Sequence, residues 1–111
     1  MAEPDLAALV PGDLVTSLRG RDRGTVSLVW GILGRQRVAI VDGELHPLAR
    51  PKAKNRRHLQ AMGHATDLAH RIALGQPLSD GEIRKAIAAY VEAQRVAQSN
   101  GEGGSRSGEG R

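Results

Sequence analysis

Short runs of alternating apolar residues, separated by glycine-containing turns, place the strongest constraint on how the first half of this chain folds. In 25-TVSLVWGIL-33 the large apolar residues occupy every second position, which is the period of one face of a β-sheet. These residues are Val26, Leu28, Trp30 and Ile32. A second run, 38-VAIV-41, ends at Asp42-Gly43. Asp-Gly between extended segments favours a tight hairpin, because a type I′ turn needs positive φ at both central residues.

Further strands are expected around these two runs. The segment 13-DLVTSLR-19 predicts a strand, and Gly34 is expected to turn the hairpin between the runs described above. Pro47 confines 45-LHPL-48 to a sheet edge, because proline cannot donate to a β-ladder. Four or five short strands in about fifty residues predict a mainly β protein, with a small antiparallel β-barrel over residues 12–63.

The second half of the chain has helical patterns. The segment 79-SDGE-82 has the spacing of a capping box, and Leu78 and Ile83 lie where a hydrophobic staple would place them. One apolar face then continues to about Val96. A shorter helix is expected over 67-DLAHRIAL-74. These patterns predict two short C-terminal α-helices after the barrel.

The composition of the ends completes the expected organisation. The segment 99-SNGEGGSRSGEGR-111 has no apolar residue and predicts a disordered Gly/Ser tail after a helical extension over residues 64–98. Residues 1–11 are expected to be flexible or to form a short helix, and their acidic start is the reverse of a secretory signal. No apolar run approaches the roughly 18 residues of a membrane span. A cytoplasmic protein is therefore expected.

Positive charge is concentrated in the first half. Between Gly12 and His58 ten Lys and Arg residues face four Asp and Glu residues, whereas six of each follow His58. The densest stretch, 50-RPKAKNRRH-58, has five cations and no acid. Such runs are usually solvated, but this distribution is also typical of a nucleic-acid-binding surface. An anionic membrane would suit the charge too, but no basic amphipathic helix with an aromatic face is present.

The pentad 20-GRDRG-24 is the sharpest local feature of the basic half. Two glycines bracket a charged loop between apolar strands. Gly24 would let the backbone bend tightly, so that Arg21 and Arg23 face a phosphate backbone. A plain charged hairpin loop is the alternative interpretation.

The run 12-GDLVTSLRGRDRGTVSLV-29 resembles the KOW motif, an RNA-associated motif in which alternating apolar residues surround a key glycine. Gly24 corresponds to that glycine, Gly12-Asp13 opens the motif, and Gly20 begins its loop. The similarity extends over roughly residues 12 to 90, and it is to small bacterial KOW-domain RNA-binding proteins. These are related to a KOW-type ribosomal protein of the archaeal and eukaryotic large subunit.

In that group an Asp-Gly turn leads to a Pro-Lys-x-Lys run and a His-Leu pair. Here the matching residues are Asp42-Gly43, Pro51-Lys52-Ala53-Lys54 and His58-Leu59. The resemblance implies a Src-homology-3-like barrel and association with RNA or the ribosome. The chain departs from the group in its Gly/Ser tail and in Arg23, where lysine is common.

The residues expected to contact RNA share positive charge and a position in the basic half. They are Arg19, Arg21, Arg23, Arg35, Arg37, Arg50, Lys52, Lys54, Arg56, Arg57 and His58, although for His58 packing is an equal alternative. The chain has one Trp, one Tyr and no Phe, and Trp30 lies on an apolar face, so bases have no stacking platform. Structured RNA, with ribosomal RNA and ribosomal proteins as the expected partners, therefore fits best.

Other classes of function are disfavoured. His58, His64 and His70 recur every sixth residue, but six residues turn a helix by about 600°, so these side chains would not share a face and no metal site is expected. The chain has no cysteine, and no serine has the context of a catalytic nucleophile. No enzyme, cofactor or small-molecule substrate is expected. The rival interpretations are a KOW-like protein-interaction module and, more distantly, a DNA-binding regulator.

Overall fold

The computed structural model describes residues 9–105, and side chains are described through residue 98. Five strands precede two helices, in the order that the sequence predicts. The elements are β1 (Asp13–Ser17), β2 (Val26–Ile32), β3 (Arg37–Val41), β4 (Lys52–Asn55), the 3₁₀ helix η2 (Arg56–His58), β5 (Leu59–His64), α1 (Thr66–Ala73) and α2 (Asp80–Ser105).

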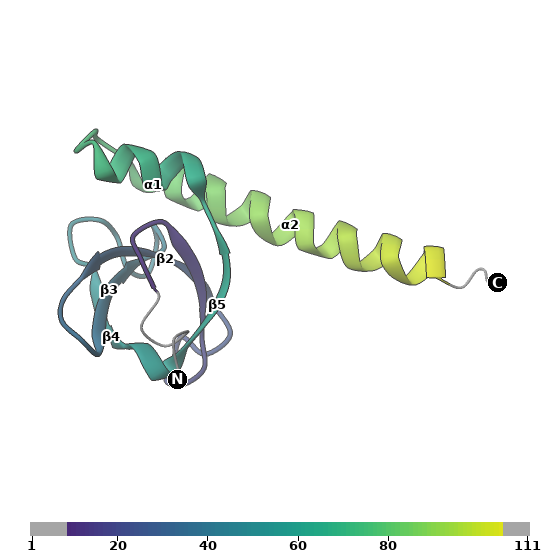
Figure 1. Cartoon of the computed structure of the whole chain (residues 1–111), viewed down its shortest axis with the longest axis horizontal. Helices are drawn as coiled ribbons and strands as arrows, with labels where there is room; N and C mark the ends of the chain where they lie inside the picture. The colour runs from purple at the N-terminus through teal and green to yellow at the C-terminus, as the bar shows by residue number, and fades with distance from the viewer. Residues whose placement is uncertain (1–8, 106–111) are drawn as a thin grey trace.

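The five strands form one antiparallel sheet with the order β4-β3-β2-β1-β5. The sheet curls, and α1 and α2 lie over one side of it (Figure 1). In the described part of the chain no ladder joins β4 to β5, so these two strands are the edges of an open sheet. The prediction of a small, mainly antiparallel β fold is thus confirmed at the level of the sheet.

The sheet buries apolar side chains on both faces. One cluster consists of Leu9, Val15, Val29, Val38, Ile40 and Leu59. The other, which we call the helix-side core, consists of Leu14, Leu28 and Val41 with Leu68 of α1 and Ile83 of α2. Val26 and Trp30 pack against the second cluster, as the alternation predicts, but Ile32 is exposed because the register shifts between Val29 and Gly31. The helices bury the face that would otherwise be solvated.

The prediction of an edge strand over residues 45–48 is wrong. The chain from Asp42 to Pro51 is a connection, and the edge strand is β4, which lies within the charged run. Asp42 accepts hydrogen bonds from the backbone N–H groups of Glu44 and His46, both at 2.8 Å, and so closes a local turn in place of a two-residue hairpin. Gly43 does adopt positive φ (79°).

Helix α2 begins with the predicted capping box. The Ser79 N–H donates to Glu82 Oε1 at 2.9 Å, and the Glu82 N–H donates to Ser79 Oγ at 3.1 Å. Leu78 and Ile83 both belong to the helix-side core, as a hydrophobic staple requires. Helix α1 begins at Thr66, one residue before the predicted start, and ends at Ala73.

Helix α2 extends further than predicted and projects away from the sheet (Figure 1). It continues through Ser105, whereas the sequence predicts a disordered tail from residue 99; residues 106–111 of that expected tail and residues 1–8 of the expected N-terminal segment lie outside the described residues. A nucleated helix can continue beyond its apolar face, because each further residue adds one backbone hydrogen bond. Among the described helices none is long and apolar enough to cross a membrane.

Candidate nucleic-acid interface

The pentad 20-GRDRG-24 forms the connection between β1 and β2. Gly20 and Gly24 both have positive φ (90° and 87°), and the Gly24 N–H donates to Ser17 O at 2.8 Å, where the loop closes. The Arg21 and Arg23 side chains are exposed, as the functional interpretation of this loop requires. The loop therefore presents two guanidinium groups to solvent.

The charged run of residues 50–58 consists largely of regular secondary structure. Its residues form β4 and η2, and this regular structure divides the five cations into an exposed set and an internal set. Lys52 and Lys54 alternate with Ala53 along β4, so both lysines point to the same side of the sheet. Their cross-strand partners are Ile40 and Val38, which belong to the first core.

Lys54 is buried beneath the β1–β2 connection. Its ammonium group donates to Asp22 Oδ1 at 2.8 Å and to the backbone oxygen of Arg19 at 3.1 Å. Both side chains of the Lys54–Asp22 pair are only 9 % exposed. The expectation that Lys54 contacts RNA is thus corrected: its charge is used inside the protein, where it joins the β1–β2 connection to β4.

The environment of Asp22 favours its charged form. Burial would raise the pKa of this carboxyl group, but the hydrogen bond from Lys54, the Lys54 charge and the further contributions of its own backbone and of His46 together lower the pKa below its ordinary value of 3.8. The aspartate is therefore ionised in the folded protein at neutral pH.

The lowered pKa of Asp22 predicts a loss of stability in acid. A group with a depressed folded-state pKa stabilises the protein above its unfolded pKa, and this contribution disappears as the pH falls through the folded value. We expect the free energy of unfolding, measured by urea titration, to fall as the pH drops below about 4, and Asp22→Asn to reduce that slope. A residual slope is expected from Glu82, whose pKa is lowered first by its hydrogen bond from Arg71. An unchanged slope in Asp22→Asn would contradict the prediction.

Arg56 is the second cation of the charged run whose side chain is buried. It is buried, its backbone N–H donates to Gln36 O at 2.7 Å, and its guanidinium group donates to Gly34 O at 3.4 Å. Arg56 therefore fastens η2 to the turn between β2 and β3. The expectation of an RNA contact is corrected here too, because the side chain is engaged in the fold.

The remaining expected cations are exposed and form two groups. The first group surrounds the β1–β2 connection and the start of β4, and the second lies at the β2–β3 turn and η2. The first group is Arg19, Arg21, Arg23, Arg50 and Lys52, and the second is Arg35, Arg37 and Arg57. Lys52 and Asn55 mark the two ends of β4, which are about 10 Å apart at 3.3 Å per residue.

Two members of the first group, Arg21 and Lys52, line a surface hollow. Gly20, Arg21 and Asp22 line it from the β1–β2 connection, Lys52 and Lys54 line it from β4, and Leu45 and His46 complete it. The ion pair between Lys54 and Asp22 lies in this hollow, so the two basic segments singled out in the sequence meet there. This meeting of segments distant in sequence is the main feature of the candidate interface.

His58 is half-buried, and its backbone oxygen accepts from the Leu18 N–H at 2.8 Å. Sequence reasoning missed two residues of the interface, Asp22 and His46. The position of Asp22 as the single acid between two arginines was a usable signal, whereas nothing in the sequence around His46 indicated a role. Within the described residues, no group of three or more His, Cys, Asp or Glu side chains is arranged to hold a metal ion.

Both aromatic side chains are engaged with the fold. Trp30 is partly buried against the helix-side core. The Tyr90 hydroxyl donates to Met62 O at 2.7 Å, and the Tyr90 ring lies so close to Gly63 that a Cβ there would be 2.8 Å from it. Neither ring is presented as a free platform for an unpaired base.

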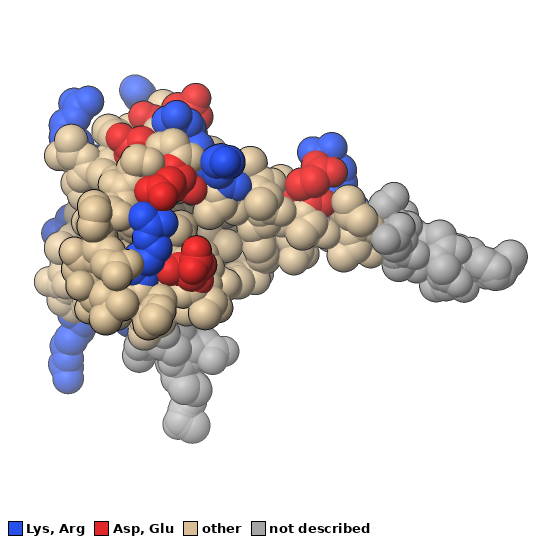
Figure 2. All heavy atoms as spheres, turned by 90° about the horizontal axis from the view of Figure 1, so that it is seen from above, with Lys and Arg blue, Asp and Glu red and all other residues tan. Residues whose placement is uncertain are grey.

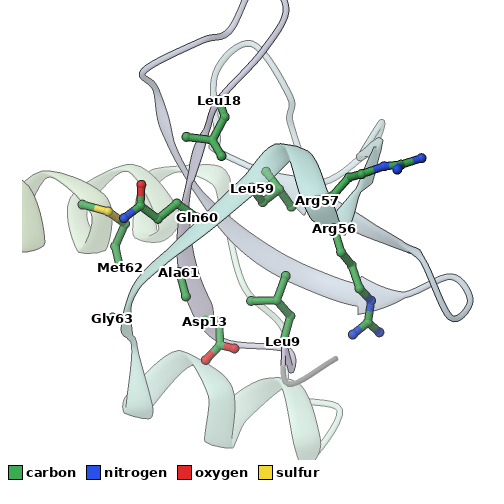
Figure 3. A pocket seen from close by; sticks show the side chains of 10 residues that line it. All are labelled: Leu9, Asp13, Leu18, Arg56, Arg57, Leu59, Gln60, Ala61, Met62 and Gly63. Carbon is green, nitrogen blue, oxygen red and sulfur yellow. The ribbon is translucent and has the colours of Figure 1, made fainter. Parts of the chain in front are cut away.

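A groove of about 670 Å³ follows the free edge of β5. Leu9, Leu18 and Leu59 give it an apolar lining, and Arg56 and Arg57 extend to one side of it from η2 (Figure 3). Asp13 and Gln60 also line the groove, so its lining mixes apolar and polar side chains and differs from that of the basic hollow.

The side of the molecule covered by the helices has mixed charge. Lys and Arg lie beside Asp and Glu over this side (Figure 2), and Arg71 pairs with Glu82 at 3.0 Å. The candidate interface therefore consists of the exposed cations in the β-rich part of the chain, residues 19–57. No protein-family model and no curated protein matches the sequence.

Proposed function

We propose that this chain is a non-enzymatic RNA-binding protein that contacts the phosphate backbone of structured RNA. One observation carries the proposal: the Lys54–Asp22 ion pair joins the β1–β2 connection to β4, so that exposed cations of both segments border one hollow. Arginine and lysine at such a surface neutralise phosphates, and a fixed backbone keeps them in register.

The fixed conformation of the segments that carry the exposed cations supports this mechanism. Hydrogen bonds from Lys54 and Arg56 already hold the β1–β2 connection and η2, so binding a polyanion costs less conformational entropy than ordering a free charged loop. Arginines outnumber lysines among the exposed cations, and a guanidinium group can make two parallel hydrogen bonds to one phosphate. The engagement of Trp30 and Tyr90 with the fold favours duplex or folded RNA over an unpaired strand.

We further propose that the sheet is a Src-homology-3-like barrel of the KOW type and that the RNA is ribosomal. The strand order and the 3₁₀ helix between β4 and β5 are compatible with such a barrel. The positive φ of Gly24 suits the key glycine of the motif that the sequence resembles. Association with the large ribosomal subunit or its assembly follows from that resemblance.

A protein-interaction module is the second candidate. The apolar groove beside β5 favours it, because an edge strand with an apolar lining can accept an extended peptide (Figure 3). Sedimentation of a cell lysate separates the two proposals: migration with large ribosomal subunits favours the first, and migration with a protein complex free of RNA favours the second.

The salt dependence of binding tests the RNA surface. Each neutralised phosphate contributes about −0.9 to the slope of log K against log salt for a duplex. Changing Arg50, Lys52 and Arg57 to glutamine should flatten the slope for a duplex RNA by about two to three units, and adding Arg21→Gln and Arg23→Gln should flatten it by about one or two more. The variants should stay folded, because surface substitutions usually change stability by no more than about 0.5 kcal/mol each.

The matched control removes two charges from helix α2. Lys85 and Arg95 are exposed on that helix, and changing both to glutamine alters the net charge as much as changing Arg21 and Arg23. The control should keep the wild-type slope. Equal slopes for all folded variants would place the binding surface elsewhere or show that there is none.

A further inference from the structure

His46 reaches into the basic hollow from a turn whose backbone is fixed at several points. The Asp42 carboxylate accepts from the His46 N–H at 2.8 Å, and the His46 carbonyl accepts from the Asp42 N–H at 2.9 Å. From helix α2 the Arg84 guanidinium group donates to Gly43 O at 2.6 Å. The position of the imidazole is thus set by the fold of the turn and by α2.

The imidazole faces the carboxylate that holds the β1–β2 connection. His46 Nε2 lies 3.5 Å from Asp22 Oδ2, and in the described part of the chain neither of these buried atoms has a hydrogen-bond partner. The other carboxylate oxygen, Oδ1, accepts from Lys54. Asp22 therefore lies between the Lys54 ammonium group on β4 and the His46 imidazole on the 42–46 turn.

We propose that His46 is a positioning residue of the RNA interface, that it acts through Asp22, and that its protonation strengthens RNA binding as the pH falls. The proposal rests on the proposed function and adds a regulation to the same site. A neutral imidazole offers Asp22 Oδ2 at most a long hydrogen bond, whereas an imidazolium forms an ion pair with it. That pair would fasten the 20–24 loop to the 42–46 turn as well as to β4.

The charges around the ring determine the direction of the effect. Asp22 faces His46 from the β1–β2 connection, Arg21 shares the hollow from the same connection, and Lys52 and Lys54 share it from β4. Asp42, on the turn itself, accepts from the His46 backbone N–H. The Asp22 carboxylate lies 3.5 Å from His46 Nε2 and can form an ion pair with an imidazolium.

Protonation should act on RNA binding in two ways with the same sign. It fastens the loop that carries Arg21 and Arg23, and it adds a positive charge to a hollow that we assign to phosphate contacts. Binding should therefore tighten as the pH falls and an imidazolium forms. Linkage requires that RNA binding in turn promotes proton uptake.

The first experiment measures the loop in the absence of RNA. The Thr25 N–H donates to Asp22 O at 3.0 Å, so its hydrogen-exchange protection reports how firmly the loop is held. After correction for intrinsic exchange, we expect the protection factor of this amide to rise severalfold from about pH 8 to about pH 5.5 in the wild type. The rise should be absent in His46→Gln, which keeps a polar side chain without the titration.

The second experiment measures affinity for a duplex RNA probe at the same two pH values and constant ionic strength. The wild type should bind about two- to fivefold more tightly at the lower pH, the size expected of one partly exposed ion pair. His46→Gln should lose most of this gain. His70→Gln, which changes an exposed histidine of α1, should retain it.

The outcomes distinguish this proposal from the proposed function. A wild-type pH response that persists in His46→Gln, for both exchange and affinity, would overturn the role of His46. RNA binding that is absent at both pH values, while the Thr25 protection still depends on His46, would overturn the proposed function and uphold His46 as the residue that positions the loop.

Discussion

Replacing Lys54 with glutamine is expected to lower the free energy of unfolding by about 3–5 kcal/mol, the usual cost of removing one partner from a buried ion pair. Lys54 and Asp22 are both 9 % exposed, so the variant would leave a buried carboxylate without its principal cation. The hydrogen bond from Lys54 to Arg19 O would be lost as well. Urea unfolding of the variant and the wild type at neutral pH measures the difference.

Lys52→Gln is the matched control for this prediction. Lys52 lies two residues earlier on the same strand and the same side of the sheet, but it is exposed. Its substitution should change stability by no more than about 0.5 kcal/mol while weakening RNA binding and flattening its salt dependence. Nearly equal stabilities of the two variants would show that the Lys54–Asp22 pair does not hold the β1–β2 connection.

Gly12→Ala is expected to lower the free energy of unfolding by about 2–5 kcal/mol, because the change strains the backbone and also overpacks a contact with helix α1. Gly12 has φ 101°, a conformation that side chains rarely adopt. A Cβ at this position would overlap the Ala69 side chain, lie 2.9 Å from Ala69 Cα and lie 3.2 Å from the His64 ring. Thermal or urea unfolding measures the loss.

Gly24→Ala separates the two contributions. Gly24 also has positive φ (87°), but a Cβ there would meet no atom within 4 Å. Only backbone strain is then expected, with a cost of about 1–2 kcal/mol. A loss at Gly24 as large as that at Gly12 would contradict the packing explanation, and no loss at Gly24 would contradict the need for a glycine at this position of the loop.

The division of the charged run changes how its function is tested. Changing all five cations of residues 50–58 to glutamine would combine a binding defect with the removal of two internal side chains, Lys54 and Arg56. A loss of RNA binding in that variant would then have two explanations, the loss of surface charge and the loss of the folded structure. Restricting the substitutions to Arg50, Lys52 and Arg57 keeps the internal contacts and isolates the surface charge.

Structural elements that depend only on neighbouring residues were predicted well from the sequence. The alternation around Leu28 placed β2, Gly34 marked the turn to β3, and the capping box of Ser79 and Glu82 placed the start of α2. Each of these patterns acts over a few residues, because a β-face has a period of two and a cap joins residues three apart. The loop with exposed Arg21 and Arg23 was found for the same reason.

Features that depend on distant residues were missed or misplaced. The Asp42-Gly43 turn was identified, but Arg84 contacts Gly43 and Asp80 contacts Leu48, and these contacts shape a longer connection than a hairpin. Leu48, expected in an edge strand, instead donates its N–H to Asp80 Oδ1 at 2.8 Å. The competing partner comes from 32 residues away, and no local pattern reveals it.

The sequence by itself determined an antiparallel sheet followed by two helices, a concentration of positive charge in the sheet, and a glycine-bracketed basic loop. Only the tertiary structure decided which cations are free to meet a ligand. Lys52 and Lys54 have the same chemistry and face the same side of β4, and they differ in whether the β1–β2 connection covers them. Burial depends on which segments pack over a residue. A lysine is therefore exposed at position 52 and forms an internal ion pair at position 54.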